Sequence, residues 1–211
     1  MSSDLAQEAL RINARWIREI VEPFDICPFA EQAMRGGHVA RRVIVADDDA
    51  ARAAEARVLV DEMARDEQIE VALLIFPTVT MSAVAFDAWC APLREANPAF
   101  VAAVFHPATA YELTTPAQAV GFFRRAPDPT LQLVRVSALD RVRGAGGKFM
   151  FDFSAAAWAE LKKREHRLPT SERIARDNHA LVVRDGISTL QAIYDDIRAD
   201  RDRSYRAAGG E

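Results

Sequence analysis

The sequence has few cysteines and glycines, and it lacks a long apolar run. Cys27 and Cys90 are the only two cysteines in 211 residues, too few for the disulfide framework of a small secreted domain. Nine glycines and ten prolines are too few for a fibrous or low-complexity chain. No stretch approaches the roughly 20 uninterrupted apolar residues that cross a bilayer. These absences exclude a disulfide scaffold, a repetitive chain and a membrane-spanning helix.

The charges are nearly balanced, with 27 Lys and Arg against 31 Asp and Glu and a net charge of −4. Such a chain has no overall basic field to attract nucleic acid or an anionic membrane. Residues 1–8 carry an acid where a signal peptide needs a basic segment and a long apolar run. We therefore expect a cytoplasmic protein without a nucleic-acid or membrane partner. Half of the residues are apolar, enough for one domain, residues 1–211, with a core of its own.

Helix and strand patterns alternate along the first half of the chain. The stripe of apolar residues from Asp4 to Val21 predicts an amphipathic helix. Strands are then predicted at 41–46, 71–76 and 100–105, a helix at 47–66, and a second helix that Thr80 or Ser82 caps and Asn97-Pro98 ends. This order predicts an α/β fold: a small, mainly parallel or mixed sheet with a βαβαβ core, an N-terminal amphipathic helix and a helical C-terminal extension.

The second half gives weaker patterns. Residues 131–136 fit either a fourth strand or the start of a helix. Gly144 to Gly147 form a break, and the charged stretch 170–206 predicts two helices docked on the domain. We therefore divide the single domain into an α/β core, residues 1–140, and a glycine-rich loop with a C-terminal helical extension, residues 141–211.

Cys27 and His106 are the candidate catalytic residues. Cys27 precedes Pro28 in an apolar loop, where it is either a nucleophile or a small buried hydrophobe. It lacks the second cysteine of a Cys-x-x-Cys redox motif. His106 ends an apolar strand, a place where α/β sheets bind ligands. Its imidazole is either an acid, base or metal ligand, or a ring whose nitrogen simply bonds a neighbouring carbonyl. Cys90 lies on the apolar face of its helix and is expected in the core.

Arginines around the proline-rich turn 125–130 are the candidate anion-binding residues. A guanidinium offers a planar fork of donors that suits a carboxylate or phosphate. Arg125 begins the turn. Arg135, within an apolar run, either faces solvent or is held inside by a carboxylate.

No familiar catalytic or cofactor motif is present. Gly147-Lys148 fails as a phosphate loop, because Val142 stands where the first glycine belongs and Phe149 where the hydroxyl belongs. Zinc-finger, EF-hand, metalloprotease and dinucleotide motifs are also absent. A metal ion or haem would need ligands gathered by the fold, and His106, Cys27 and His179 are the candidates.

Several short motifs follow one another in an order that resembles a known family. They are Trp16 in the first helix, Cys27-Pro28-Phe29-Ala30, Phe105-His106-Pro107, Arg125-x-Pro127-x-Pro129, and Leu131-x-Leu133-x-Arg135. The order and spacing resemble the bacterial family domain of unknown function 1415, from about Arg15 to Arg135, with a weaker echo at 172–178. The resemblance implies that Cys27, His106, Arg125 and Arg135 belong to one pattern.

The chain also departs from that family, which typically has histidine where Gln132 stands and serine where Ala126 stands. If the family's histidine is a metal or haem ligand, this protein has lost or replaced it. We therefore add Gln132 to Arg125 and Arg135 as a candidate substrate-binding residue.

Three functions follow as hypotheses. The first is an enzyme acting on a small anionic molecule, with His106 as general acid or base, Cys27 as nucleophile or pocket wall, and Arg125 and Arg135 holding the anion. The second is a metal- or haem-binding protein that uses His106 with Cys27 or His179. The third is a non-catalytic binding or assembly module whose C-terminal helices meet a partner. The sequence leaves the substrate, the reaction and the oligomeric state open.

Overall fold

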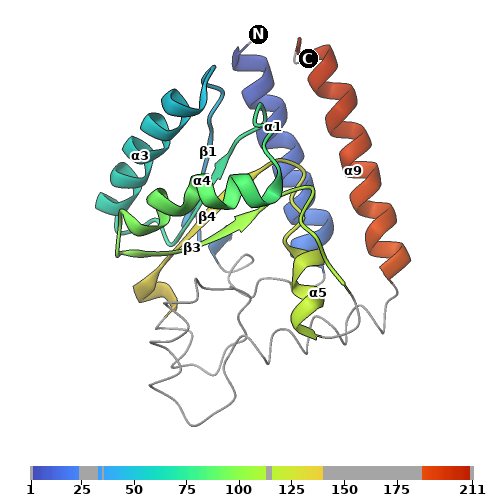
Figure 1. Cartoon of the computed structure of the whole chain (residues 1–211). Coiled ribbons are helices and arrows are strands. Elements are labelled where there is room, and N and C mark those ends of the chain that lie inside the picture. Colours follow the sequence, from blue (N-terminus) through green and yellow to red (C-terminus); the bar gives the residue numbers. More distant parts are fainter. Residues whose placement is uncertain (1, 24–32, 35, 113–115, 140–186, 210–211) are drawn as a thin grey trace.

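The computed structural model describes residues 2–23, 33–34, 36–112, 116–139 and 187–209. Its helices are α1 (Ser2–Trp16), α3 (Asp49–Arg65), α4 (Ala83–Glu95), α5 (Pro116–Phe123) and α9 (Ile187–Ala207), and its strands are β1 (Val39–Val43), β2 (Val71–Ile75), β3 (Phe100–Phe105) and β4 (Thr130–Arg135). A π-helical turn, η1 (Ile17–Val21), continues α1. Figure 1 shows the sheet between α3 and α4 on one side and α1 and α9 on the other.

The four strands form one mixed sheet in the order β1-β2-β4-β3. β1 and β2 are parallel, and β4 runs antiparallel to both of its neighbours, β2 and β3. The succession β1-α3-β2-α4-β3 is the predicted βαβαβ core, so the α/β fold with a mixed sheet is confirmed. The ambiguous segment 131–136 belongs almost entirely to β4, which is inserted between β2 and β3.

Successive side chains of the central strands enter two different hydrophobic clusters, as the period of a strand requires. Leu74 and Leu133 pack with buried residues of α3 and α4. Leu73 and Val134 pack with α1, η1 and α9 on the other face. β2 and β4 are buried along their whole length, which explains why β2 has an almost continuous apolar sequence.

Side-chain caps set the starts of the two crossover helices. The Asp48 carboxylate accepts a hydrogen bond from the Ala51 amide at 2.8 Å and begins α3. The Ser82 hydroxyl accepts one from the Ala85 amide at 3.2 Å and begins α4, so Ser82 rather than Thr80 is the cap. Each cap satisfies one of the amides that a helix start leaves without an intrahelical partner.

The C-terminal helix α9 lies beside α1 (Figure 1) and belongs to the main core. Leu190, Tyr194, Ile197 and Tyr205 recur on one face of α9 and are buried with residues of α1 and the sheet. This helix is one of the two predicted within 170–206; the other falls outside the described residues. The predicted C-terminal extension therefore supplies one wall of the same core.

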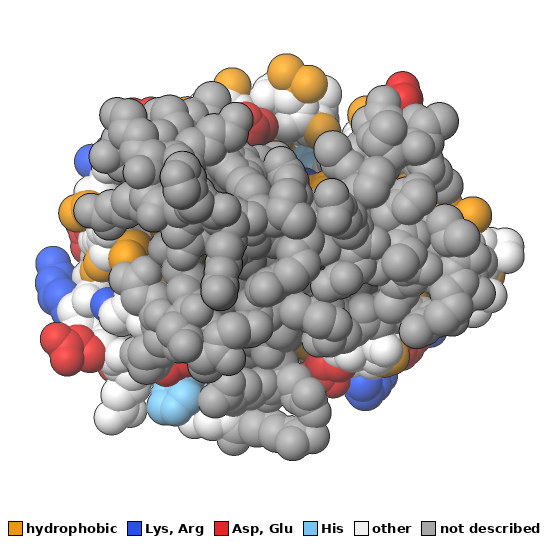
Figure 2. Space-filling model, turned by 90° about the horizontal axis from the view of Figure 1, so that it is seen from below, with side chains coloured by type: hydrophobic (Ala, Val, Ile, Leu, Met, Phe, Trp, Pro, Cys, Tyr) orange, Lys and Arg blue, Asp and Glu red, His pale blue; other side chains and the backbone are white. Residues whose placement is uncertain are grey.

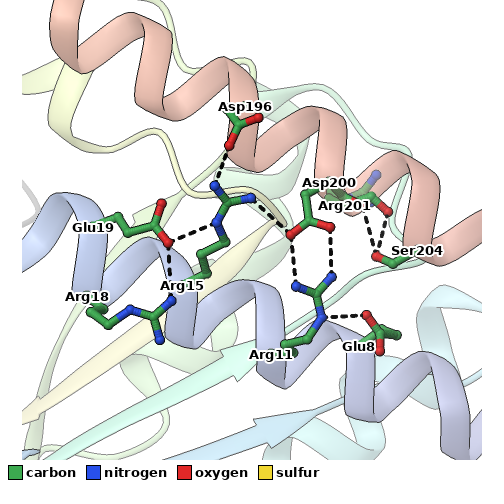
Figure 3. Close-up of polar contacts among 9 residues, drawn as sticks. All are labelled: Glu8, Arg11, Arg15, Arg18, Glu19, Asp196, Asp200, Arg201 and Ser204. Atoms are coloured by element: carbon green, nitrogen blue, oxygen red, sulfur yellow. Dashed lines mark hydrogen bonds and ion pairs between the residues drawn. The ribbon is translucent and has the colours of Figure 1, made fainter.

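Ion pairs join the exposed sides of α1 and α9 (Figure 3). Arg11 binds the Asp200 carboxylate through two hydrogen bonds, at 2.8 and 3.0 Å. Arg15 also reaches Asp200, at 3.0 Å, and pairs with Asp196 and Glu19. Because these groups are partly exposed, we expect each pair to contribute no more than about 1 kcal/mol.

Acid should weaken the contact between α1 and α9. The hydrogen bond from Arg11, with help from Arg15, lowers the pKa of Asp200 to about 2. A lowered folded-state pKa gives stability that is present above the unfolded-state pKa, near 4, and lost as pH falls through about 2. Asp200→Asn should therefore flatten the fall in unfolding free energy between about pH 4 and pH 2, as measured by urea denaturation. The same slope in this variant as in the wild type would contradict the prediction, and Asp87→Asn, which breaks a pair within α4, is the control.

Candidate functional site

Two of the predicted site residues, His106 and Arg125, lie next to strand ends at one edge of the sheet. The His106 amide donates to the Arg124 carbonyl at 3.0 Å, and the Phe76 amide donates to the Pro129 carbonyl at 2.9 Å. These bonds join the segments after β2 and β3 to the turn before β4. We call residues 76–79, 106–111 and 124–129, with the α9 side chains that contact them, the strand-end edge.

His106 is buried at this edge, with 5% of its surface exposed. Its Nε2 lies 3.1 Å from the Met81 carbonyl oxygen, and its Nδ1 accepts from the Ala108 amide at 3.1 Å. These partners assign the proton to Nε2, and burial lowers the pKa of His106, which favours the neutral ring. The imidazole thus ties the end of β3 to the segment before α4. The sequence left two roles open for His106, and this geometry fits the structural one, in which a ring nitrogen bonds a neighbouring carbonyl.

Arg125 lies in a cage of aromatic rings at the same edge. Its guanidinium carbon is 4.1 Å from the centre of the Tyr194 ring, 5.2 Å from that of Tyr111 and 5.4 Å from that of Phe122. Its Nη1 donates to the Gln191 side chain at 2.7 Å. Three rings from three segments therefore orient the guanidinium, and the Gln191 bond uses one of its five N–H donors.

Gly121 allows this cage to form. A Cβ atom at Gly121 would lie 2.3 Å from the Ala110 carbonyl oxygen, so only glycine permits α5 to approach the 106–111 segment this closely. The approach places Tyr111 against Phe122, with ring centres 5.1 Å apart. The close packing of the α5 backbone thus determines the positions of Tyr111 and Phe122, two of the three rings around Arg125.

Arg135 lies at the opposite edge of the sheet. It pairs with Phe100, whereas Thr130, at the other end of β4, pairs with Phe105. Since a strand advances about 3.3 Å per residue, five residues separate Arg135 from the His106 end by roughly 17 Å. The expectation that His106 and Arg135 lie together is therefore corrected.

The acceptors of the Arg135 side chain are backbone carbonyls at the end of α3. Its guanidinium donates to Met63, Ala64, Asp66 and Ile69 at 2.7 to 3.4 Å. It thereby satisfies carbonyls that a helix end leaves without partners and complements the helix dipole. The sequence offered two alternatives for Arg135, a solvent-facing side chain or one held by a carboxylate. Both are wrong, because its guanidinium is bound by backbone carbonyls.

Gln132 is buried in the middle of β4, opposite Leu73 and Ala103. Those two neighbours belong to the cluster under α1 and α9, and paired residues share a face of the sheet. Gln132 therefore points into that side of the core, two residues from the strand end that carries Thr130. The structure separates Gln132 from Arg135 on β4, because their side chains lie on opposite faces.

Sequence reasoning missed a buried polar group centred on Asp128. The Asp128 carboxylate accepts from Arg201 Nε and from the Tyr205 hydroxyl, both at 2.6 Å, and only 2% of its surface is exposed. Burial raises the pKa of Asp128, although Arg201 and Tyr205 oppose the shift. The sequence does contain the residues of this group: an acid between two prolines, and an Arg-x-x-x-Tyr pair on α9. No local sequence pattern indicates that these two distant segments contact each other.

The remaining candidates can be placed only in part. Cys27 and His179 lie outside the described residues. Cys90 is buried beneath α4, as predicted, and burial raises the pKa of its thiol to about 12, so it is an inert core thiol. Within the described ranges, no three His, Cys, Asp or Glu side chains gather as a metal site would require. His106 could bind a metal only by giving up one of its two hydrogen bonds.

Figure 2 shows described side chains around the rim of one face of the molecule. They include hydrophobic, basic and acidic groups next to one another. None of the helices in the described part of the chain has the length and apolar character needed to cross a bilayer.

The fold and the site define an α/β protein with a mixed four-stranded sheet and a strand-end edge of buried polar and caged basic side chains. The model of the family DUF1415, a protein of unknown function, matches residues 8–146. The chain belongs to this family, which confirms the resemblance seen in the sequence. No curated protein and no solved structure matches it. The match ends before α9, whose side chains complete the strand-end edge.

Proposed function

We propose that this protein is an enzyme that acts on a small anionic molecule, and that Arg125 holds the anion. The cage around its guanidinium is the observation that carries the proposal. Ordering a long side chain costs conformational entropy when a ligand binds. Because three rings and Gln191 already hold Arg125, much of that cost is met before binding, and its planar fork suits a carboxylate or phosphate.

The other predicted residues take different parts in this proposal. His106 shapes the 106–111 segment that carries Tyr111, since both of its ring nitrogens bond to backbone groups. Arg135 lies at the opposite edge of the sheet and stays outside the proposed site. Gln132 faces the core under α1 and α9, and we assign it no part in holding the anion. Cys27 is the remaining candidate nucleophile among the residues of the family-like pattern. The aromatic faces around Arg125 favour an anion with a planar or apolar portion.

Replacing Arg125 should weaken anion binding. Calorimetric titrations of the full chain with inorganic phosphate, acetate and malonate identify which anion binds. Arg125→Gln should weaken binding of that anion about 10- to 100-fold, because a charged hydrogen bond contributes about 1.5–3 kcal/mol. Arg125→Lys should fall between, since it keeps the charge without the fork.

The matched control is Arg94→Gln, which removes an arginine paired with Asp87 on the exposed side of α4. It should bind the anion as the wild type does. Each variant's thermal unfolding without ligand shows whether the fold is intact. Equal affinity of Arg125→Gln and the wild type, or no binding of any of the anions, would contradict the proposal.

A further inference from the structure

A second candidate site is a cavity of about 180 Å³ between the start of α1, the segment after β2 and the last turns of α9. Its lining comes from three parts of the chain that are distant in sequence: Leu5, Pro77, Thr78, Arg201, Asp202, Tyr205 and Arg206. It lies toward the C-terminal end of α9, whereas Gln191 and Tyr194 of the Arg125 cage belong to the first two turns. Ten residues of helix separate Gln191 from Arg201, about 15 Å of rise.

Part of the cavity lining is apolar, and the cavity has a size that fits one ring. Leu5 and Tyr205 are both buried, and Pro77 adds a rigid apolar wall. A dry apolar cavity of roughly 150 Å³ is known to take up benzene. A single six-membered ring with one small substituent therefore fits the available volume.

The charges around the cavity leave one cation without a partner. Arg201 donates to the carboxylates of Asp128 and Asp202 and to the Pro77 carbonyl, so its guanidinium is already occupied. The Arg206 guanidinium has no ion pair or hydrogen bond within the part of the chain that the structure describes. The charges of these two arginines and two acids sum to zero, which favours a ligand with a single negative charge over a dianion.

Thr78 adds a hydroxyl to the same lining. Its Oγ1 accepts a long hydrogen bond from Arg52 at 3.3 Å, which leaves its own O–H free to donate to a ligand oxygen. An Arg and a hydroxyl donor together suit a carboxylate.

We propose that this cavity binds a small monocarboxylate with a flat apolar ring. The ring occupies the space between Leu5, Pro77 and Tyr205, and the carboxylate faces Arg206 and Thr78. The proposal rests on the cavity and its lining, independently of the anion at Arg125.

Benzoate is the probe, with benzyl alcohol and inorganic phosphate as comparisons, titrated into the full chain by calorimetry and followed on the Leu5 methyl groups by NMR. Benzoate should bind saturably with a Kd of about 1 mM or tighter and shift the Leu5 signals. Arg206→Gln should weaken it by up to about fivefold, since an exposed charge contributes up to about 1 kcal/mol. Thr78→Val should also weaken it, whereas phosphate and benzyl alcohol should bind less well than benzoate.

Arg203→Gln is the matched control, because Arg203 is exposed on the same helix and does not line the cavity. It should bind benzoate as the wild type does, as should Arg125→Gln. Equal benzoate affinity in Arg206→Gln and wild type, unchanged Leu5 signals, or no saturable binding would overturn the proposal. A loss of benzoate binding in Arg125→Gln alone would assign the ligand to the Arg125 cage instead.

Discussion

A chain that ends at Gly186 should not fold cooperatively. It lacks α9, whose Leu190, Tyr194, Ile197 and Tyr205 are buried against α1 and the sheet. Burying one large apolar side chain contributes about 1.5–3 kcal/mol, so these four contribute about 6–12 kcal/mol. That sum matches the whole stability of a typical domain, about 5–15 kcal/mol. Loss of a sigmoidal transition in urea denaturation, followed by near-ultraviolet circular dichroism, is the expected result.

A second truncation serves as a control, because it shortens the chain without removing any of the buried residues of α9. A chain that ends at Ala207 keeps α9 whole, and it should unfold within about 0.5 kcal/mol of the full chain, because exposed ends contribute little. A Gly186 truncation with a native-like transition would contradict the assignment of α9 to the core.

The same experiment bears on the hypothesis of an assembly module. A helix that recruits a partner keeps an apolar face accessible, whereas the apolar face of α9 is buried within the chain. Its other faces carry charges that pair with α1, such as Asp196 and Asp200. A partner that docks on α9 would therefore meet a polar, charged surface.

The order β1-α3-β2-α4-β3 could be predicted because each of these elements carries its own local pattern, whereas no helix was expected where α5 lies. The run 71–76 is apolar throughout because β2 is covered on both faces. Ser82 predicts the start of α4 because a serine side chain can cap the first amides of a helix. The run 100–105 coincides with β3. These signals act over a few residues, so the sequence displays them directly.

The pairing of strands could not be predicted in the same way. β4 lies between β2 and β3, although β2 and β3 are joined through α4 along the chain. Nothing in the residues 131–136 indicates which strands they contact. Pairing depends on how the two faces of all four strands are covered, and α9 supplies part of that cover from the far end of the chain.

The surroundings of the candidate site residues could not be predicted for the same reason. Arg125 was recognised as an anion-binding candidate from its turn, but its cage needs Tyr194, 69 positions away. Arg135 resembled an anion-binding residue because its acceptors, the carbonyls at the end of α3, carry no sequence signature. A guanidinium in an apolar run fits either role until the fold supplies its partners.

Removing the Asp128 carboxylate should destabilise the protein strongly. Asp128→Ala leaves the Arg201 guanidinium and the Tyr205 hydroxyl without their 2.6 Å acceptor in a buried position. Breaking one partner of a buried ion pair costs about 3–5 kcal/mol, because the other charge stays desolvated. Urea denaturation at neutral pH should show a midpoint lowered accordingly, with an unchanged denaturant slope.

Two further variants test whether the loss of stability in Asp128→Ala comes from the unpaired charge of Arg201. Asp202→Ala removes the other carboxylate on Arg201, but Asp202 is 44% exposed, so the expected loss is only about 0–1 kcal/mol. Arg201→Met added to Asp128→Ala removes the unpaired cation, and the double variant should be more stable than Asp128→Ala alone. Equal losses for Asp128→Ala and Asp202→Ala, or a double variant no more stable than Asp128→Ala, would mean that Asp128 acts through packing rather than through its charge. With the expected outcome, the stability of the strand-end edge depends on an ion pair between the proline-rich turn and α9.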